Sequence, residues 1–166
     1  RLERPESLQI AGGIFYVCHK LGTPRRRRAA EPRRAFRLAG SDREVFLKKM
    51  MARVNLLPAG TRPGAAYAIS KYFVIWYARS EAARFGARGV RVLSVTPGNF
   101  DTPMGALEKE EAGTYLKFNA IPRLGKPEEI AALFAAVSDP AMGYLTGTDI
   151  LCDGGCVAGS RNRRRD

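Results

Sequence analysis

The sequence is poor in the residues that build metal sites, catalytic triads and disulfide frameworks. Its 166 residues include one histidine, His19, and three cysteines, Cys18, Cys152 and Cys156, with no CxxC pair. Zinc sites and disulfide frameworks need clusters or pairs of these residues, so we expect neither, and we expect buried or idle thiols. His19 also has no partner at the spacing of a catalytic triad.

Long apolar runs are lacking as well. No stretch approaches the ~20 consecutive apolar residues that a membrane helix needs, and the first residues do not resemble a signal peptide. Hydrophobic residues still make up 45% of the chain, which is enough for one domain with a core. We therefore expect a soluble, cytoplasmic protein without a membrane partner.

Acidic residues are scarce only in two parts of the chain. Residues 1–50 contain 13 Lys/Arg against 5 Asp/Glu and the last six contain 4 against 1, whereas residues 51–160 contain 11 against 10. The net charge of +12 therefore lies in two arginine-rich flanks. Aromatic residues do not interleave with these arginines, apart from Phe36, and no recognition motif accompanies them. We expect solvated basic flanks, with nucleic-acid association as the minor alternative.

The first 50 residues give few structural signals. Residues 8–20 have the composition of a strand, but two glycines interrupt it. The arginine- and proline-rich stretch that follows is typical of a loop or a disordered segment. Residues 45–54 predict a short helix, with Ser41 or Asp42 as its N-cap. We expect an arginine-rich, poorly organised segment over residues 1–50.

The signals improve after residue 64. The predicted elements are helices over residues 65–85, 104–118 and 126–138, a strand over residues 90–96 and a short strand within residues 146–155. The strand at 90–96 is short, β-branched and apolar, which is typical of a buried parallel strand. This order predicts an α/β fold with a parallel sheet over residues 51–159, followed by a basic tail over residues 160–166.

Tyr67 and Lys71 lie one turn apart on the predicted helix, so both side chains share a face. An ammonium close to a phenol favours the phenolate and lowers the pKa from its ordinary value of ~10. Such a pair can exchange a proton with a carbonyl or an alcohol. The spacing alone equally fits a core tyrosine with a lysine beside it, so other residues must decide.

A turn at Pro97 and Gly98 ends the predicted strand, and Asn99 and Thr102 follow it. Ligands of open α/β sheets bind outside the carboxyl ends of the strands. A Pro-Gly turn at this place lets the backbone approach a flat ligand, and Thr102 offers a hydroxyl and an N–H group. The alternative interpretation is simple punctuation between a strand and a helix.

Four motifs in order resemble the short-chain dehydrogenase/reductase family. They are Tyr67-x-x-x-Lys71, Pro97-Gly98 with Thr102, Arg123-Leu-Gly-Lys-Pro-Glu-Glu-Ile130 and Tyr144-Leu-Thr-Gly-Thr-Asp-Ile-Leu-Cys-Asp-Gly-Gly155. The resemblance covers roughly residues 63 to 158 and corresponds to the C-terminal half of a doubly wound, Rossmann-like domain. Residues 101–104 are similar to those of the hydroxysteroid-dehydrogenase branch.

The resemblance implies an NAD- or NADP-dependent oxidoreductase that acts on an alcohol or a ketone. Tyr67 would be the catalytic acid/base, and Lys71 would bind the nicotinamide ribose and tune Tyr67. The implied cofactor-binding residues are Tyr67, Lys71, Pro97, Gly98, Asn99 and Thr102. The segment from Met104 to Ala120 would be the substrate loop.

The resemblance also implies a homo-oligomer, built through helices 65–85 and 126–138 and the last strand. A subunit interface would explain the many aromatic residues of the first of these helices, namely Tyr72, Phe73, Trp76 and Tyr77. Ordinary packing against the sheet is the alternative explanation.

Two family features are missing from the sequence. No TGxxxGxG turn, which would bind the pyrophosphate, leads from a strand into a helix, so the N-terminal strand–helix units have no counterpart. The family's catalytic serine would stand near Val54 and Asn55, and Ser7, Ser41 and Thr61 lack its context.

Three hypotheses fit these departures. The favoured one is a truncated or misread gene product with impaired cofactor binding, because the composition changes near residue 45 and the chain ends in RNRRRD. The second is a divergent enzyme that takes its nucleotide-binding half from another chain. The third is an inactive module for binding or oligomerisation.

Overall fold

The structure, a computed structural model, describes residues 14–16, 33–103 and 116–162. Three parallel strands form one sheet in the order β1-β2-β3. They are β1 (Ile14–Tyr16), β2 (Leu93–Pro97) and β3 (Asp149–Cys152). The predicted α/β fold with a parallel sheet is therefore confirmed for this part of the chain. The helix predicted over residues 104–118 lies mostly outside the described residues.

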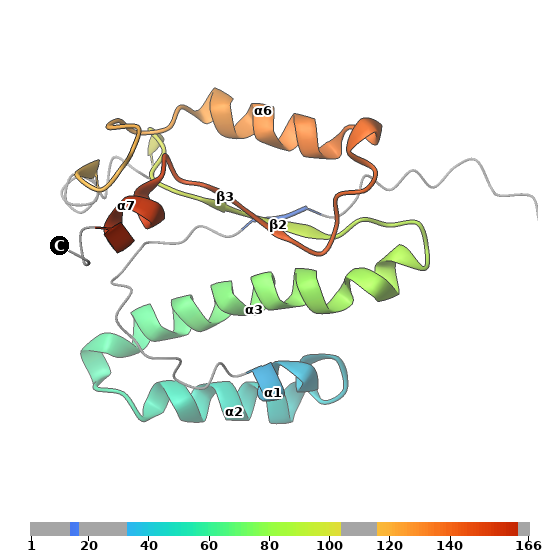
Figure 1. Ribbon diagram of the computed structural model, residues 1–166. Helices are drawn as coiled ribbons and strands as arrows, with labels where there is room; N and C mark the ends of the chain where they lie inside the picture. Colours follow the sequence, from blue (N-terminus) through green and yellow to red (C-terminus); the bar gives the residue numbers. More distant parts are fainter. Residues whose placement is uncertain (1–13, 17–32, 104–115, 163–166) are drawn as a thin grey trace, which may run out of the picture.

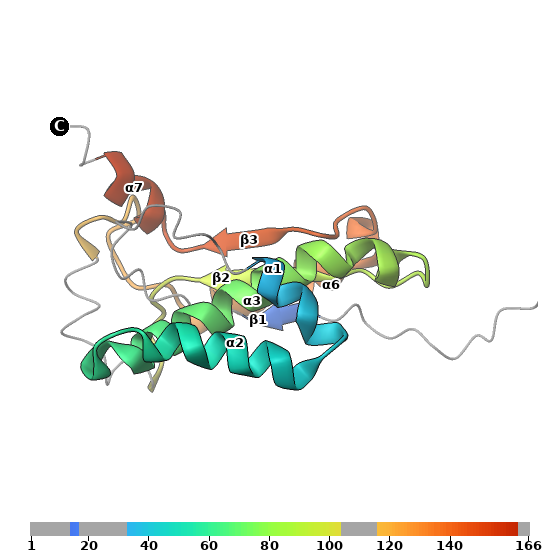
Figure 2. The same ribbon diagram turned by 90° about the horizontal axis from the view of Figure 1, so that it is seen from below.

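Helices cover both faces of the sheet (Figure 1). Helix α3 (Arg62–Gly86) lies along one face and helix α6 (Pro127–Ser138) along the other. Helices α1 (Arg33–Phe36) and α2 (Arg43–Asn55) lie on the far side of α3, as the view from below also shows (Figure 2). The remaining helical segments are η1 (Arg37–Gly40), η2 (Ala59–Thr61), η3 (Pro140–Met142) and α7 (Cys156–Asn162).

Strand β2 is the middle strand, and all five of its residues are buried. Leu93 and Val95 pack with Val137 of α6 in a core on one side of the sheet. Side chains alternate along a strand, so Ser94 and Thr96 face the other side, towards α3. A strand that is covered on both faces has a nearly continuous apolar sequence, which is why this strand could be predicted.

Helices α2 and α6 begin within two residues of their predicted starts, whereas α1 and α7 were not predicted from the sequence. Asp42 is the N-cap of α2, because its Oδ1 accepts a hydrogen bond of 2.9 Å from the Val45 N–H, so the predicted cap and helix are confirmed. Helix α3 begins at Arg62, three residues before the predicted start. Pro63 is tolerated there because the N–H groups of the first turn have no intrahelical partner.

A second core forms between α1, α2 and α3. Phe36 is only 2% exposed and packs with Met50 of α2. On α3 its partners are Phe73, at 5.3 Å between ring centroids, and Trp76, at 5.6 Å. The described residues 33–50 therefore form packed helices, in contrast to the poorly organised segment that composition suggested. Phe73 and Trp76 are half-buried within one chain, packed against the core of α1 and α2.

No helix in the described ranges is both long enough and apolar enough to cross a membrane.

Candidate functional site

Tyr67 and Lys71 lie together on the first half of α3, as their one-turn spacing predicts. The Lys71 Nζ is 5.1 Å from the centroid of the Tyr67 ring, which is a cation–π distance. Tyr67 is 42% exposed, so part of this residue is accessible to solvent. Tyr67 is therefore not one of the buried core tyrosines that the spacing alone allowed.

The pair lies at the same end of the molecule as the carboxyl end of β2. Helix α3 runs antiparallel to β2, because a short loop connects the end of α3 to the start of the strand (Figure 1). The start of α3 and the end of β2 therefore lie on one side. This is the edge of a parallel sheet at which ligands bind in open α/β folds.

Pro97, expected to begin a turn, is the last residue of β2 and pairs with Cys152 at the end of β3. The Gly98 N–H donates to the Cys152 carbonyl over 2.8 Å. A Cβ atom at Gly98 would lie 2.6 Å from the Asp153 Cα, so no larger residue fits. The sequence suggested that this glycine admits a flat ligand, whereas here it admits the backbone of residue 153. Close strand packing is thus sufficient to explain Gly98.

Beyond Gly98, residues 99–102 are held by backbone hydrogen bonds to Gly125. The Gly125 N–H donates to the Asn99 carbonyl over 3.0 Å, and the Asp101 N–H donates to the Gly125 carbonyl over 2.8 Å. The Asn99 and Thr102 side chains are half-buried. The structure thus brings Asn99 and Thr102 next to Pro97 and Gly98 in one continuous segment.

A cavity of about 140 Å³ lies beside this segment. Asn99, a predicted cofactor-binding residue, contributes to its polar lining. The other polar residues were not predicted as site residues; they are Asn119, Arg123, Glu129 and Asp153. Among the described buried side-chain atoms, Asn119 Oδ1 has no hydrogen-bond partner. The cavity is smaller than the ~300 Å³ at which ligand pockets commonly begin. A cavity of this volume is too small to enclose a dinucleotide.

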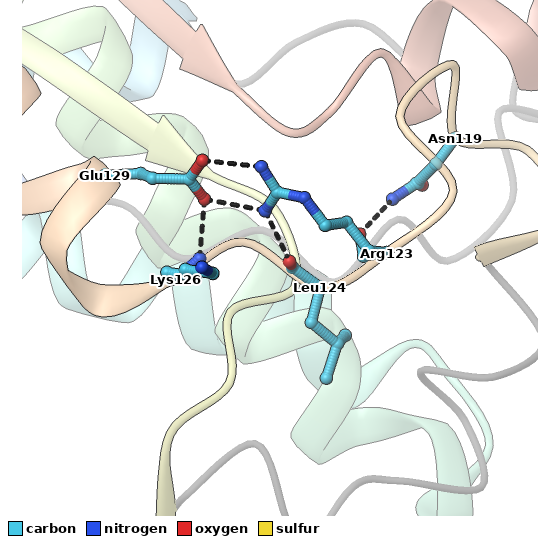
Figure 3. A network of polar contacts seen from close by, with 5 residues as sticks. All are labelled: Asn119, Arg123, Leu124, Lys126 and Glu129. Atoms are coloured by element: carbon cyan, nitrogen blue, oxygen red, sulfur yellow. Dashed lines mark hydrogen bonds and ion pairs between the residues drawn. The ribbon is translucent and has the colours of Figure 1, made fainter.

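Arg123 and Glu129 form a two-pronged ion pair beside the cavity (Figure 3). The Arg123 Nη1 and Nη2 atoms donate to Glu129 Oε2 and Oε1 over 2.8 and 2.6 Å. Hydrogen bonds from Arg123 and from the Lys126 N–H lower the pKa of Glu129 to about 2. The same hydrogen bond, with the charge of Glu129, raises the pKa of Arg123.

A second polar network lies between β2 and β3. The Asp149 carboxylate accepts hydrogen bonds from Ser94 Oγ at 2.6 Å and from Thr96 Oγ1 at 2.9 Å. Ser94 and Asp149 are partners in the strand register. Both hydroxyls are thereby satisfied although Ser94 and Thr96 are buried. No sequence motif marked this network, because it depends on the pairing of two distant strands.

The cysteines of the C-terminal part have little thiolate character. Burial, followed by the charge of Asp153, raises the pKa of both Cys152 and Cys156. This agrees with the expectation of unreactive thiols, since the thiolate is the nucleophile and the metal ligand. In the described ranges no three His, Cys, Asp or Glu residues are grouped as a metal site.

The position expected for a catalytic serine is helical. Val54 and Asn55 end helix α2, and Val54 is buried in its core. Ser41 and Thr61 make local turn bonds to the carbonyls of Leu38 and Pro58. Ser7 lies outside the described residues.

The turn between β3 and α7 does not fit the pyrophosphate of a dinucleotide. The turn Asp153-Gly154-Gly155 leads from β3 into α7. The Asp153 carboxylate already accepts from the N–H groups of Gly155 and Val157, over 2.9 and 2.8 Å. A phosphate there would meet a carboxylate of the same charge.

Comparisons with known proteins identify the family. The family model described as enoyl-(acyl carrier protein) reductase, of the short-chain dehydrogenase type, matches residues 50–157. The short-chain reductase protein NovJ of Streptomyces niveus is 35% identical over 74% of this chain and 47% of its own length. The 3-oxoacyl-[acyl-carrier-protein] reductase FabG of Vibrio cholerae is 33% identical over 72% of this chain and 52% of its own length.

Solved structures give the same result. A short-chain dehydrogenase/reductase from Serratia marcescens superimposes with a TM-score of 0.52 and 38% identity, over 55% of this chain and 38% of that one. A blue fluorescent protein from a metagenomic library, solved with NADPH, has a TM-score of 0.52 and 33% identity, over 55% and 37%. The chain spans about half the length of the curated relatives it matches. Over that span, it belongs to the short-chain dehydrogenase/reductase family.

Proposed function

We propose that this chain carries the substrate and nicotinamide end of an NAD(P)-dependent oxidoreductase that interconverts an alcohol and a ketone. The observation that carries the proposal is the exposed Tyr67 with the Lys71 ammonium 5.1 Å from its ring. Both belong to the first half of α3, which lies at the end of the sheet where β2 ends, and ligands of open α/β sheets bind outside the carboxyl ends of the strands. One similar solved structure contains NADPH.

The proposed role of Tyr67 is to move one proton. Its Oη gives a proton to the carbonyl oxygen of a ketone during reduction and takes the hydroxyl proton of an alcohol during oxidation. A phenol ordinarily has a pKa of about 10, so it is a poor base near neutrality. The Lys71 ammonium favours the phenolate and makes both directions accessible.

The bound nicotinamide supplies or accepts the hydride. Lys71 and Tyr67 would hold its ribose by hydrogen bonds from the ammonium and the phenol. Residues Pro97 to Asn99, with Thr102, would hold its carboxamide at the end of β2. The choice between NAD and NADP stays open, as does the hydroxysteroid branch.

The activity belongs to a site larger than the described residues. The pyrophosphate and the adenosine need a binding surface that Asp153 does not provide. A homo-oligomer through α6 and the edge strand β3 stays part of the proposal, and the exposed Leu151 of β3 favours it. The cytoplasmic location also stays a prediction.

The test compares two tyrosines of α3 that are similarly exposed. Tyr67→Phe removes the proposed proton donor, whereas Tyr72→Phe is the control at a side chain that is 49% exposed. We expect Tyr67→Phe to lower the turnover of NADH or NADPH with cyclohexanone or ethyl acetoacetate by ~10²–10⁴-fold. Absorbance at the nicotinamide band measures the rate.

Tyr72→Phe should keep the rate of the original chain. Equal rates for Tyr67→Phe and the original chain would remove Tyr67 from the mechanism. Binding of NADPH without turnover in the original chain would favour an inactive binding module.

A further inference from the structure

Residues 99–102 leave the sheet after β2 and depend on another loop for their position. Two backbone hydrogen bonds, both described above, connect them to Gly125, and Phe100 and Gly125 form an isolated parallel bridge. No strand of the described sheet continues beyond Pro97 to hold this segment. The position of Gly125 therefore determines where Asn99 and Thr102 lie.

The contact at Gly125 tolerates little movement. A Cβ atom on this residue would lie 2.6 Å from Cε1 of the Phe100 ring, so the ring rests directly on the glycine backbone. A shift of the loop that carries Gly125 would break the ring contact and both hydrogen bonds together. The loop, residues 119–126, must itself be fixed for the segment to stay in place.

The Arg123–Glu129 pair fixes the backbone groups on both sides of Gly125 (Figure 3). Before it, the Leu124 carbonyl accepts from Arg123 Nη1 over 2.9 Å. After it, the Lys126 N–H donates to Glu129 Oε2 over 2.7 Å. The two-pronged ion pair then joins these two anchors at the first turn of α6. Gly125 thus sits between two clamped peptide groups.

We propose that Arg123 and Glu129 are positioning residues that hold residues 99–102 in the conformation that binds the nicotinamide. Neither side chain needs to touch cofactor or substrate, since they act through Gly125. The catalytic consequence rests on the proposed function, whereas the effect on the backbone does not. A cap that only starts α6 would leave the hydrogen bonds of Asp101 and Gly125 unchanged.

The experiment compares variants of the full chain by amide hydrogen exchange and by kinetics. Arg123→Gln and Glu129→Gln each remove the ion pair. Arg84→Gln is the matched control, because it removes the exposed Arg84–Glu81 ion pair, also 2.6 Å long, inside a single helix. The exchange of the Ser94 N–H, which donates to Thr148 in the sheet, reports whether the fold is intact.

We expect both pair variants to speed exchange at the Asp101 and Gly125 amides by about tenfold or more, with Ser94 unchanged. We also expect KM for NADPH to rise several-fold while kcat changes less, and Arg123→Lys to recover part of the loss. Arg84→Gln should change none of these values. Unchanged exchange at Asp101 and Gly125 in a folded Glu129→Gln variant would overturn the inference.

The two proposals fail separately. A chain without turnover in any variant contradicts the proposed function, but the exchange rates of Asp101 and Gly125 still decide the positioning role. If Arg123→Gln does not fold, Glu129→Gln and Arg123→Lys give the same readout.

Discussion

Two glycines at the site, Gly98 and Gly125, lie in close contact with neighbouring atoms, and the contacting group differs between them. Gly98 is approached by the backbone of Asp153, which cannot move without moving β3. Gly125 is approached by the ring of Phe100, which belongs to the segment it supports. Because neither residue has a side chain, the neighbouring atoms can approach the backbone closely. These contacts position the segment that is proposed to bind the nicotinamide.

Gly98→Ala tests the first of these contacts. The added Cβ meets Asp153 Cα at 2.6 Å, so we expect a loss of roughly 1–3 kcal/mol in the free energy of unfolding. Gly86→Ala is the matched control, because nothing lies within 4 Å of its Cβ position. Urea unfolding of both variants gives the comparison, and an equal stability for the two would contradict the packing explanation of Gly98.

The loop of residues 119–126 depends on the first turn of α6 for its position. The acidic residue Glu129 of this turn serves the helix by accepting the Lys126 N–H and serves the loop by binding Arg123. The sequence predicted the helix start from Lys126-Pro127-Glu128-Glu129, and this is confirmed. The partner Arg123 was visible only as part of a motif, because pairing across a loop leaves no periodic signal.

The pH dependence of stability should report on this turn. The pKa of Glu129 falls from its ordinary 4.5 to about 2 in the folded chain, so the carboxylate stabilises the fold above pH 4.5. That contribution is lost as the pH falls from 4.5 towards 2. The charged groups facing Glu129 are Arg123 and Lys126, which stay protonated in this range.

Urea midpoints measured at several pH values between 5 and 2.5 check this expectation. The difference between the original chain and Glu129→Gln should shrink as the pH falls, and added salt should reduce it because both side chains are exposed. A difference that stays constant over this range would exclude the ion pair as its source.

At the scale of the whole molecule, local sequence signals predicted individual helices and strands, whereas their packing depends on contacts between residues that are distant in the sequence. Some features depend only on residues that are close in the sequence, so they could be predicted. They are the apolar run of β2, the Asp42 cap and the start of α6. The packing of Phe36 could not, because this residue stands among arginines that indicate a solvated segment. The Asp149 network also escaped prediction, since its donors lie on another strand.

The covering of α3 by α1 and α2 leads to the broadest prediction. Phe36 contacts both Phe73 and Trp76, and Trp76 is the single tryptophan of the chain. Phe36→Ala should therefore lower the free energy of unfolding by about 3–5 kcal/mol and let water reach the indole. The fluorescence emission of the folded variant should shift to the red.

Val137→Ala is the control for this prediction, because Val137 is equally buried but belongs to the core between β2 and α6. It should lower stability and leave the emission of Trp76 unchanged. If the emission of Phe36→Ala is also unchanged, α1 does not cover this face of α3 in solution. Phe73 and Trp76 would then be available to a second subunit, because both would lie on an open face of a helix that the family resemblance assigns to an interface.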